Sequence, residues 1–143
     1  MTIARLIAGQ SGEVWTIHAD DTVAQAVEVL ATRRIGALPV RDTTEDVVGI
    51  FSERDVLYSL RRHGGDVLAL KVHEVMTSPV VTVSPDTSVM EALALMTRRR
   101  FRHLPVVDGG RMVSFISIGD LVKYRIDRIE AEAEAMRAYI QTA

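Results

Sequence analysis

The amino-acid sequence contains the same pattern twice, and this duplication limits the possible folds more than any other feature. The stretch from Val14 to Val40 matches the stretch from Val80 to Val106 without a gap. Both copies carry an acidic turn, an aliphatic helical pattern, a pair of arginines and the tripeptide Leu-Pro-Val. A duplicated unit of this length predicts two copies packed about a pseudo-twofold axis, and therefore two related clefts between them.

Length and composition fit one domain rather than two independent ones. The chain has 143 residues, and a half of about 60 residues is only marginally stable alone. The net charge of −2 gives no general attraction to nucleic acid, and no apolar run approaches the length of a membrane helix. The absence of cysteine excludes disulfides, cysteine-ligated zinc and thiol catalysis. Because the first residues also lack an apolar leader, we expect a cytoplasmic protein without a membrane partner.

Each repeat predicts the order strand, helix, strand, strand, helix. In the first repeat, a helix begins at the cap signal Asp20–Thr22 and ends near Arg34, because Gly36 and Pro39 oppose its continuation. The other predicted elements are strands at 38–40 and 47–51, a helix from Ser52 to His63, a helix over 87–99, strands near 103–107 and 111–116, and short helices over 3–8 and 70–75.

The last predicted helix, over 118–141, is longer than its counterpart in the first repeat. Its apolar residues recur at spacings of 4, 3, 4, 3 and 4, which is a heptad pattern: Val122, Ile126, Ile129, Ala133, Met136 and Ile140. The flanking positions are mostly charged. Two readings stay open: a helix packed on its own domain, or an intersubunit helix that forms a homodimer.

Four motifs, in order and repeated, resemble a tandem cystathionine β-synthase (CBS) domain pair, also called a Bateman module. They are Thr16-Ile17 with Thr82-Val83, Leu38-Pro39-Val40 with Leu104-Pro105-Val106, the segment Gly49–Asp55, and its partner Ser114–Asp120. The resemblance covers nearly the whole chain and places repeat 1 at 8–66 and repeat 2 at 75–126 within one module over 1–143. It implies an α/β (α+β) fold in which the two β-α-β-β-α repeats pack sheet to sheet, with an extended C-terminal helix.

The resemblance also implies a function. Modules of this family commonly bind adenosine-containing ligands such as AMP, ADP, ATP, S-adenosylmethionine or NAD, often form flat dimers, and usually regulate another protein rather than catalyse. In the family, each cleft combines base-side residues of one repeat with the Ser-x-x-Asp motif of the other. Site A would then contain Thr16, Ile35, Gly36, Ala37, Ser117 and Asp120. Site B would contain Thr82, Phe101, Arg102, His103, Ser52, Arg54 and Asp55.

The chemistry of the Ser-x-x-Asp motif supports either of two roles. A helix N-terminus with a serine favours phosphate, and an ionised carboxylate can accept from the two hydroxyls of a ribose. In the family, the aspartate grips this diol, which gives the role to Asp55 and Asp120. The same spacing also fits a capping box that only satisfies the helix end. Gly36 has two readings too: it either admits a flat ring or ends a helix.

The two sites are expected to differ. Site B has Arg54 where site A has Gly119, and it also includes Arg102 and His103, so it should prefer more phosphate charge. Ser114 stands where the family usually has glycine, whereas the first repeat has Gly49. We therefore expect one strong site and one weaker or differently selective site.

Two other function classes remain as alternatives. The basic run Arg98–Arg102 could serve a nucleic-acid or protein-interaction module together with the C-terminal helix, although a net-acidic chain makes nucleic acid a weak case. A nucleotide-processing enzyme is the weakest alternative, because no known catalytic motif occurs. The four histidines show no metal-ligand spacing, so we expect no metal site and no required cofactor.

Overall fold

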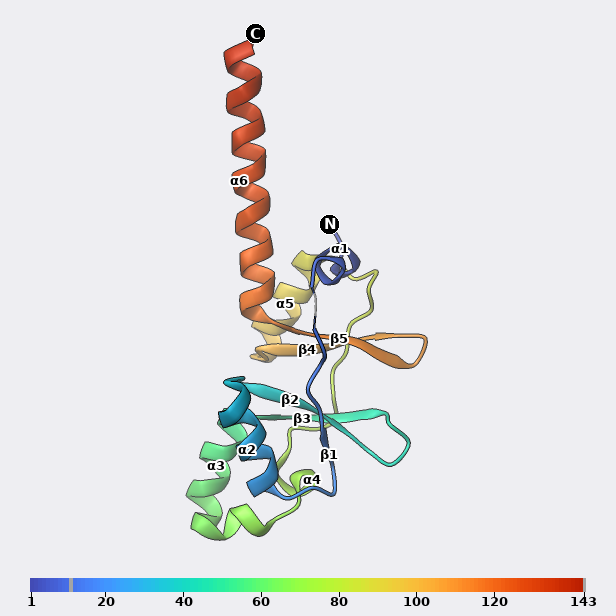
Figure 1. Ribbon diagram of the computed structural model, residues 1–143, viewed down its shortest axis with the longest axis vertical. Coiled ribbons are helices and arrows are strands. Elements are labelled where there is room, and N and C mark those ends of the chain that lie inside the picture. The colour runs from blue at the N-terminus through green and yellow to red at the C-terminus, as the bar shows by residue number, and fades with distance from the viewer. Residues whose placement is uncertain (11, 143) are drawn as a thin grey trace.

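A computed structural model describes residues 1–10 and 12–142 and contains two small sheets flanked by helices (Figure 1). The elements are α1 (Ile3–Ala8), β1 (Ile17–His18), α2 (Val23–Arg33), β2 (Ala37–Arg41), β3 (Val47–Ser52), α3 (Glu53–His63), the 3₁₀ helix η1 (Gly64–Ala69), α4 (Val72–Val75), α5 (Val89–Arg99), β4 (His103–Asp108), β5 (Arg111–Ser117) and α6 (Ile118–Thr142). The two sheets face each other across the middle of the molecule, as expected for the CBS pair (Figure 1).

The two repeats share a sheet topology but differ at their first strand. In repeat 1, β1 pairs in parallel with β2, and β2 pairs antiparallel with β3. In repeat 2, the strand equivalent to β1 shortens to one bridge between Val83 and Val106. The reason is Pro85, because it replaces Ala19, whose N–H donates to the Arg41 carbonyl at 2.8 Å. Proline has no N–H, so this hydrogen bond cannot form in repeat 2.

Local capping explains where the helices begin and end. Thr22, Ser52 and Ser88 are the N-caps of α2, α3 and α5, and each forms a reciprocal capping box with the residue three positions later. The helices α2 and α5 end at Arg34 and Arg100, which both adopt left-handed conformations with φ of 53° and 58°. Gly36 is therefore not the residue that ends α2, and the reading of it as a helix terminator is wrong.

Neither sequence repeat contains its whole hydrophobic core. The core around β2 and β3 includes Val67 and Val72 from η1 and α4, which follow repeat 1 in the chain. The core around β4 and β5 includes Ile3 and Leu6 from α1, at the opposite end of the sequence. The second structural unit therefore combines the N-terminal helix with the second repeat, so it is discontinuous in sequence.

Backbone hydrogen bonds attach the two short helices in equivalent ways. The N–H of Ile3 donates to the Thr87 carbonyl at 2.9 Å, and the N–H of Val72 donates to the Asp21 carbonyl at 2.8 Å. As a consequence, the chain passes from the second unit to the first between α1 and β1, and it passes back between α4 and α5 (Figure 1).

The helix α6 leaves the body of the molecule and extends far beyond it (Figure 1). Its first turns pack on the second unit, where Leu121 is fully buried and Tyr124 contacts the core. The heptad residues from Val122 to Ile140 are exposed apart from Ala133, which is partly covered. The prediction that this helix packs on its own domain is therefore correct only for its first turns. Within the described residues, no helix has both the length and the apolar character needed to cross a membrane.

Because α1 packs in the core of the second unit, we expect substitutions in this N-terminal helix to lower the stability of the protein. We expect Ile3→Ala to lower the free energy of unfolding by about 2–4 kcal/mol, because a fully buried side chain would leave a cavity. Urea unfolding measures this change. The control is Leu68→Ala, where a 44% exposed side chain should change stability by about 0.5 kcal/mol or less. Equal effects of the two substitutions would contradict the assignment of α1 to the second core.

Candidate functional site

Two cavities lie between the structural units, and both combine residues from the two repeats. The site B cavity has a volume of about 380 Å³ and is lined by residues 52–55, 77, 79–81 and 99–103 with Gly36 and Ile50. The site A cavity has a volume of about 560 Å³ and is lined by residues 12–15, 35–37 and 113–115 with Ile7, Gln10, His103, Ser117 and Asp120. Each cavity therefore contains one Ser-x-x-Asp helix start and the segment after α2 or α5 of the other repeat.

The structure brings together most residues that the sequence assigned to each site. In site B, Ser52, Arg54 and Asp55 lie in one cavity with Phe101, Arg102 and His103. In site A, Ile35, Gly36 and Ala37 lie in one cavity with Ser117 and Asp120. Thr16 and Thr82 are not among the described residues that line the cavities; in both repeats the two residues before the threonine line them instead.

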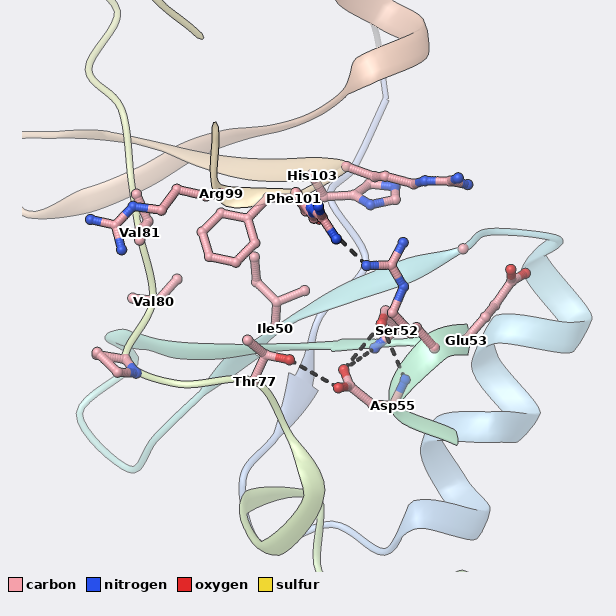
Figure 2. Close-up of a pocket in the computed structure, with 15 residues that line it drawn as sticks. Ile50, Ser52, Glu53, Asp55, Thr77, Val80, Val81, Arg99, Phe101 and His103 are labelled. Atoms are coloured by element: carbon pink, nitrogen blue, oxygen red, sulfur yellow. Dashed lines mark hydrogen bonds between the residues drawn. The ribbon is translucent and has the colours of Figure 1, made fainter. Parts of the chain in front are cut away.

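Asp55 takes part in the helix cap and also faces the site B cavity (Figure 2). Its Oδ2 accepts from the Ser52 N–H at 2.9 Å and from the Ser52 hydroxyl at 3.1 Å. Its Oδ1 accepts from the Thr77 hydroxyl at 2.9 Å. The capping interpretation is therefore correct for this residue, and the linker residue Thr77 fixes the carboxylate further. Each carboxylate oxygen can accept more than one hydrogen bond, so acceptor capacity remains toward the cavity.

The rest of site B has an apolar part and a cationic part. Figure 2 shows Phe101 from one unit facing Ile50 from the other, with Val80 beside them. The cationic part comes from the basic run, because Arg99, Arg100 and Arg102 line the cavity together with Arg54. The Arg54 guanidinium also donates to the Arg100 carbonyl at 3.4 Å, which links the two units. A flat apolar ring that carries an anionic group matches this combination.

Site A contains the equivalent carboxylate in a different setting. Asp120 Oδ2 accepts from the Ser117 N–H at 2.8 Å, and within the described residues no side chain donates to its Oδ1. The described lining contains the acidic residues Glu13 and Asp120 but no arginine or lysine. Site A is therefore the more acidic of the two cavities.

The exchange of glycine for serine between the repeats has a structural reason. A Cβ at Gly49 would lie 2.6 Å from Met76 Sδ and 2.9 Å from the Thr77 carbonyl oxygen, so no side chain fits there. The close approach arises because Thr77 pairs with Ile50 through two backbone hydrogen bonds. At the equivalent position, the Ser114 hydroxyl is buried and donates to the Gln10 amide oxygen at 3.2 Å. Gln10 therefore contacts the Ser114 position through its side chain, whereas Met76 and Thr77 closely approach Gly49.

Gly36 and His103 line both cavities and form a shared wall. A Cβ on Gly36 would lie 3.7 Å from His103 Cε1, so a glycine at this position leaves room beside the imidazole. The imidazole stacks on Phe115 at 5.3 Å between ring centroids. Burial lowers the pKa of His103 below 6.5; Asp120 opposes this shift, Arg102 adds to it, and Glu53 opposes it.

Sequence reasoning did not identify the linker residues that line the sites. Several of these residues precede β1 or the bridging residue Val83: Val14 and Trp15 in site A, and Thr77, Pro79, Val80 and Val81 in site B. Residues 14–15 align with residues 80–81 in the duplication, and this equivalence could have indicated that both pairs line a site. Thr77 had no such signal, because its role depends on the crossing of the linker. Within the described residues, no group of three or more His, Asp or Glu side chains is placed to hold a metal ion.

The lowered pKa of His103 predicts a pH dependence of stability. Between the pKa in the folded protein and 6.5, the unfolded chain binds more protons, so stability is full above pH 6.5 and falls as the pH drops below it. Urea unfolding at about pH 7.5 and about pH 5.5 should show a larger loss for the wild type than for His103→Gln. An NMR titration of the imidazole with a midpoint at or above 6.5 would contradict the prediction.

Comparison with known proteins identifies the family. The sequence model of the CBS domain matches residues 11–62 and 72–127. A mitochondrial CBS domain-containing protein of Arabidopsis thaliana, CBSX3, is 37% identical over 126 residues, which are 85% of this chain and 61% of the relative. The chain thus spans less than two thirds of that relative. The inosine-5′-monophosphate dehydrogenase of Methanocaldococcus jannaschii is 38% identical over 79% of this chain. This match covers only 22% of the dehydrogenase.

Solved structures agree with this result. A protein with CBS domains from Burkholderia ambifaria superimposes with a TM-score of 0.83 at 39% identity, covering 89% of this chain and 95% of the other. Two structures below 25% identity share the fold: CBSX2 in complex with AMP, at a TM-score of 0.72, and the domain pair of protein MJ0100 in complex with 5′-methylthioadenosine and S-adenosylmethionine, at 0.77. They cover 88% and 90% of this chain, and 96% and 98% of their own. The chain belongs to the CBS domain family and contains two repeats of that domain.

Proposed function

We propose that this protein is a non-catalytic regulatory module that binds adenine nucleotides in the clefts between its two CBS repeats. The observation that carries the proposal is the composition of the two cavities. Each joins an apolar wall from one repeat to a capped carboxylate at a helix start of the other. A nucleotide bound there would contact both units, so its binding would favour the arrangement in which the units are held together.

Site B is the proposed site for a phosphorylated ligand. The base would lie between Phe101 and Ile50, the ribose hydroxyls would donate to Asp55, and the phosphate would lie against the arginines. Three arginines of the basic run line this cavity, which favours phosphate contact over nucleic-acid binding as the role of the run. AMP, ADP and ATP are the candidate ligands, and NAD carries the same adenosine phosphate.

Site A is the proposed site for a neutral or cationic adenosine compound. The described lining offers Asp120 for the ribose but no arginine or lysine for a phosphate. Trp15 provides an aromatic face, and the Arg33 guanidinium carbon lies 3.6 Å from the centroid of the Trp15 rings. S-adenosylmethionine carries a positive sulfonium centre, which suits the carboxylates Glu13 and Asp120.

The ligands of the structural neighbours support the choice of chemical class. AMP is bound to CBSX2, and 5′-methylthioadenosine and S-adenosylmethionine are bound to the MJ0100 domain pair, so adenosine is common to all three. The proposal also includes a homodimer, a regulated protein of unknown identity as the partner that reads the ligand state, and a location in the cytoplasm. No cofactor is required in this proposal.

Replacing each carboxylate should separate the two sites. We expect Asp55→Asn to weaken AMP binding at site B at least about tenfold, because the amide keeps a cap acceptor but loses the ionised acceptor. Asp120→Asn should weaken only site A. Isothermal titration with AMP, ADP, ATP, NAD and S-adenosylmethionine measures these affinities, and the wild type should gain thermal stability as ligand increases.

The matched control is Glu91→Gln, because Glu91 forms the capping box of α5 but lines neither cavity. It should leave all affinities unchanged. Unchanged binding in both aspartate variants would refute the site assignment, and the absence of binding heat with all five compounds would refute the proposed function.

Because arginines line site B, we expect this site to bind phosphorylated ligands more tightly than adenosine without phosphate. We expect Arg54→Gln to reduce affinity for ATP about tenfold or more while adenosine binding changes little, because only the phosphate interaction is lost. Competition titrations of ATP against adenosine measure the ratio. Arg62→Gln, at the exposed end of α3, is the control and should not alter it. Equal losses for ATP and adenosine would show that Arg54 acts on the whole site rather than on phosphate.

A further inference from the structure

The helix α6 has two different apolar faces, and among the described residues only one of them packs against the rest of the chain. Leu121 is fully buried and Tyr124 packs on the second core, so this side of the helix faces the body of the molecule. The residues Val122, Ile126, Ile129, Ala133, Met136 and Ile140, which we name the α6 seam, follow a different line along the helix. In heptad terms the seam occupies the a and d positions, and Tyr124 at f lies on the opposite side.

The seam is long, regular and accessible. Ile126 and Ile129 are both 49% exposed, and Met136 and Ile140 are more exposed still. The spacing of 4 and 3 averages 3.5 residues, which keeps a seam in line only when helices supercoil around each other. A second helix with the same period is therefore the partner that this pattern fits.

The charges beside the seam are self-complementary in one orientation. In a parallel pair, each g residue faces the e residue five positions later in the other helix. Arg125 then faces Glu130 of the second copy, and Glu132 faces Arg137 of the second copy. All of these pairs are attractive, and twofold symmetry repeats each of them.

The antiparallel orientation is unfavourable by the same comparison. With the seams fully overlapped, Ile129 of one helix lies opposite Ala133 of the other. Glu132 of one helix then lies near Glu132 of the second copy, and Glu130 lies near Glu130 of the second copy. Lys123 then lies near Arg137. These flanking contacts are repulsive, so charge selects one of two arrangements that the apolar seam alone permits.

We propose that the protein forms a homodimer through a parallel two-stranded coiled coil of α6, in register over Val122 to Ile140. This proposal deepens the homodimer included in the proposed function but does not depend on ligand binding. It also distinguishes α6 from another exposed apolar surface, Leu57, Tyr58 and Leu60 on α3, which lacks a heptad repeat of comparable length.

A charged residue in the seam should dissociate the dimer. Sedimentation velocity over a dilution series should give a wild-type dimer and a dissociation constant at least about 100-fold higher for Ile129→Glu, because the substitution buries a carboxylate in an apolar seam. The control, Ala131→Glu, adds the same charge at an exposed f position and should leave the dimer intact. Thermal unfolding and ligand titration of Ile129→Glu would show that the domain remains folded.

Two further variants test the orientation. The chain has no cysteine, so Ile140→Cys should form a disulfide-linked dimer rapidly on mild oxidation, whereas Ala138→Cys at an f position should not. An antiparallel pair would place the two thiols introduced by Ile140→Cys about 27 Å apart, too far for a disulfide. Arg137→Glu should weaken a parallel dimer about five- to tenfold and strengthen an antiparallel one.

Three results would overturn the proposal. One is a wild-type protein that remains monomeric at about 100 μM, which would leave the seam for a different protein. Another is a dimer that survives Ile129→Glu but is lost in Leu57→Glu, which would assign the contact to α3. The third is a disulfide that forms in the double variant Val122→Cys/Ile140→Cys but not in Ile140→Cys alone. Loss of the dimer with unchanged AMP affinity would leave the nucleotide proposal intact.

Discussion

The rest of the structure depends on how the two hydrophobic cores are closed. Ile3 and Leu6 complete the core of the second unit, although α1 lies before the first repeat in the chain. The N-terminal linker must then cross from the second unit to the first, and the linker after α4 must cross back. Because these crossings pass beside the facing sheets, they supply one wall of each cavity. Core packing and the formation of the sites are therefore consequences of the same connection.

The helix starts link folding to the candidate chemistry. Ser52 and Asp55 satisfy the first N–H groups of α3, and the same carboxylate faces the site B cavity. The cap and the ligand role are not competing explanations, because a carboxylate fixed by backbone and hydroxyl donors is already oriented for a further donor. Thr77 adds a second fixed contact from the crossing linker, which the other site lacks within the described residues.

The differences between the copies arise from single residues in equivalent positions. Pro85 removes one hydrogen bond and reduces the first strand of repeat 2 to a bridge. Gly49 admits the close approach of Met76 and Thr77, whereas Ser114 instead bonds to Gln10. Arg54 and Arg102 line the cationic site B, whereas the equivalent residues of the other repeat are Gly119 and Gly36. The two cavities therefore have similar backbones but different charges, and this difference is the basis for the different ligand preferences that we propose.

The sequence by itself determined the two repeats, the capped helix starts, the Leu-Pro-Val strands and the heptad of α6, because these depend on local patterns or on the duplication. The resemblance to the CBS pair grouped six of the fifteen described residues that line site B and five of the fifteen that line site A. Only the tertiary structure decided that α1 belongs to the second core, that Thr77 holds Asp55, and that Val80 and Val81 rather than Thr82 line site B. These features depend on which segments cross between the units, and crossing is a property of long-range packing that no local pattern specifies.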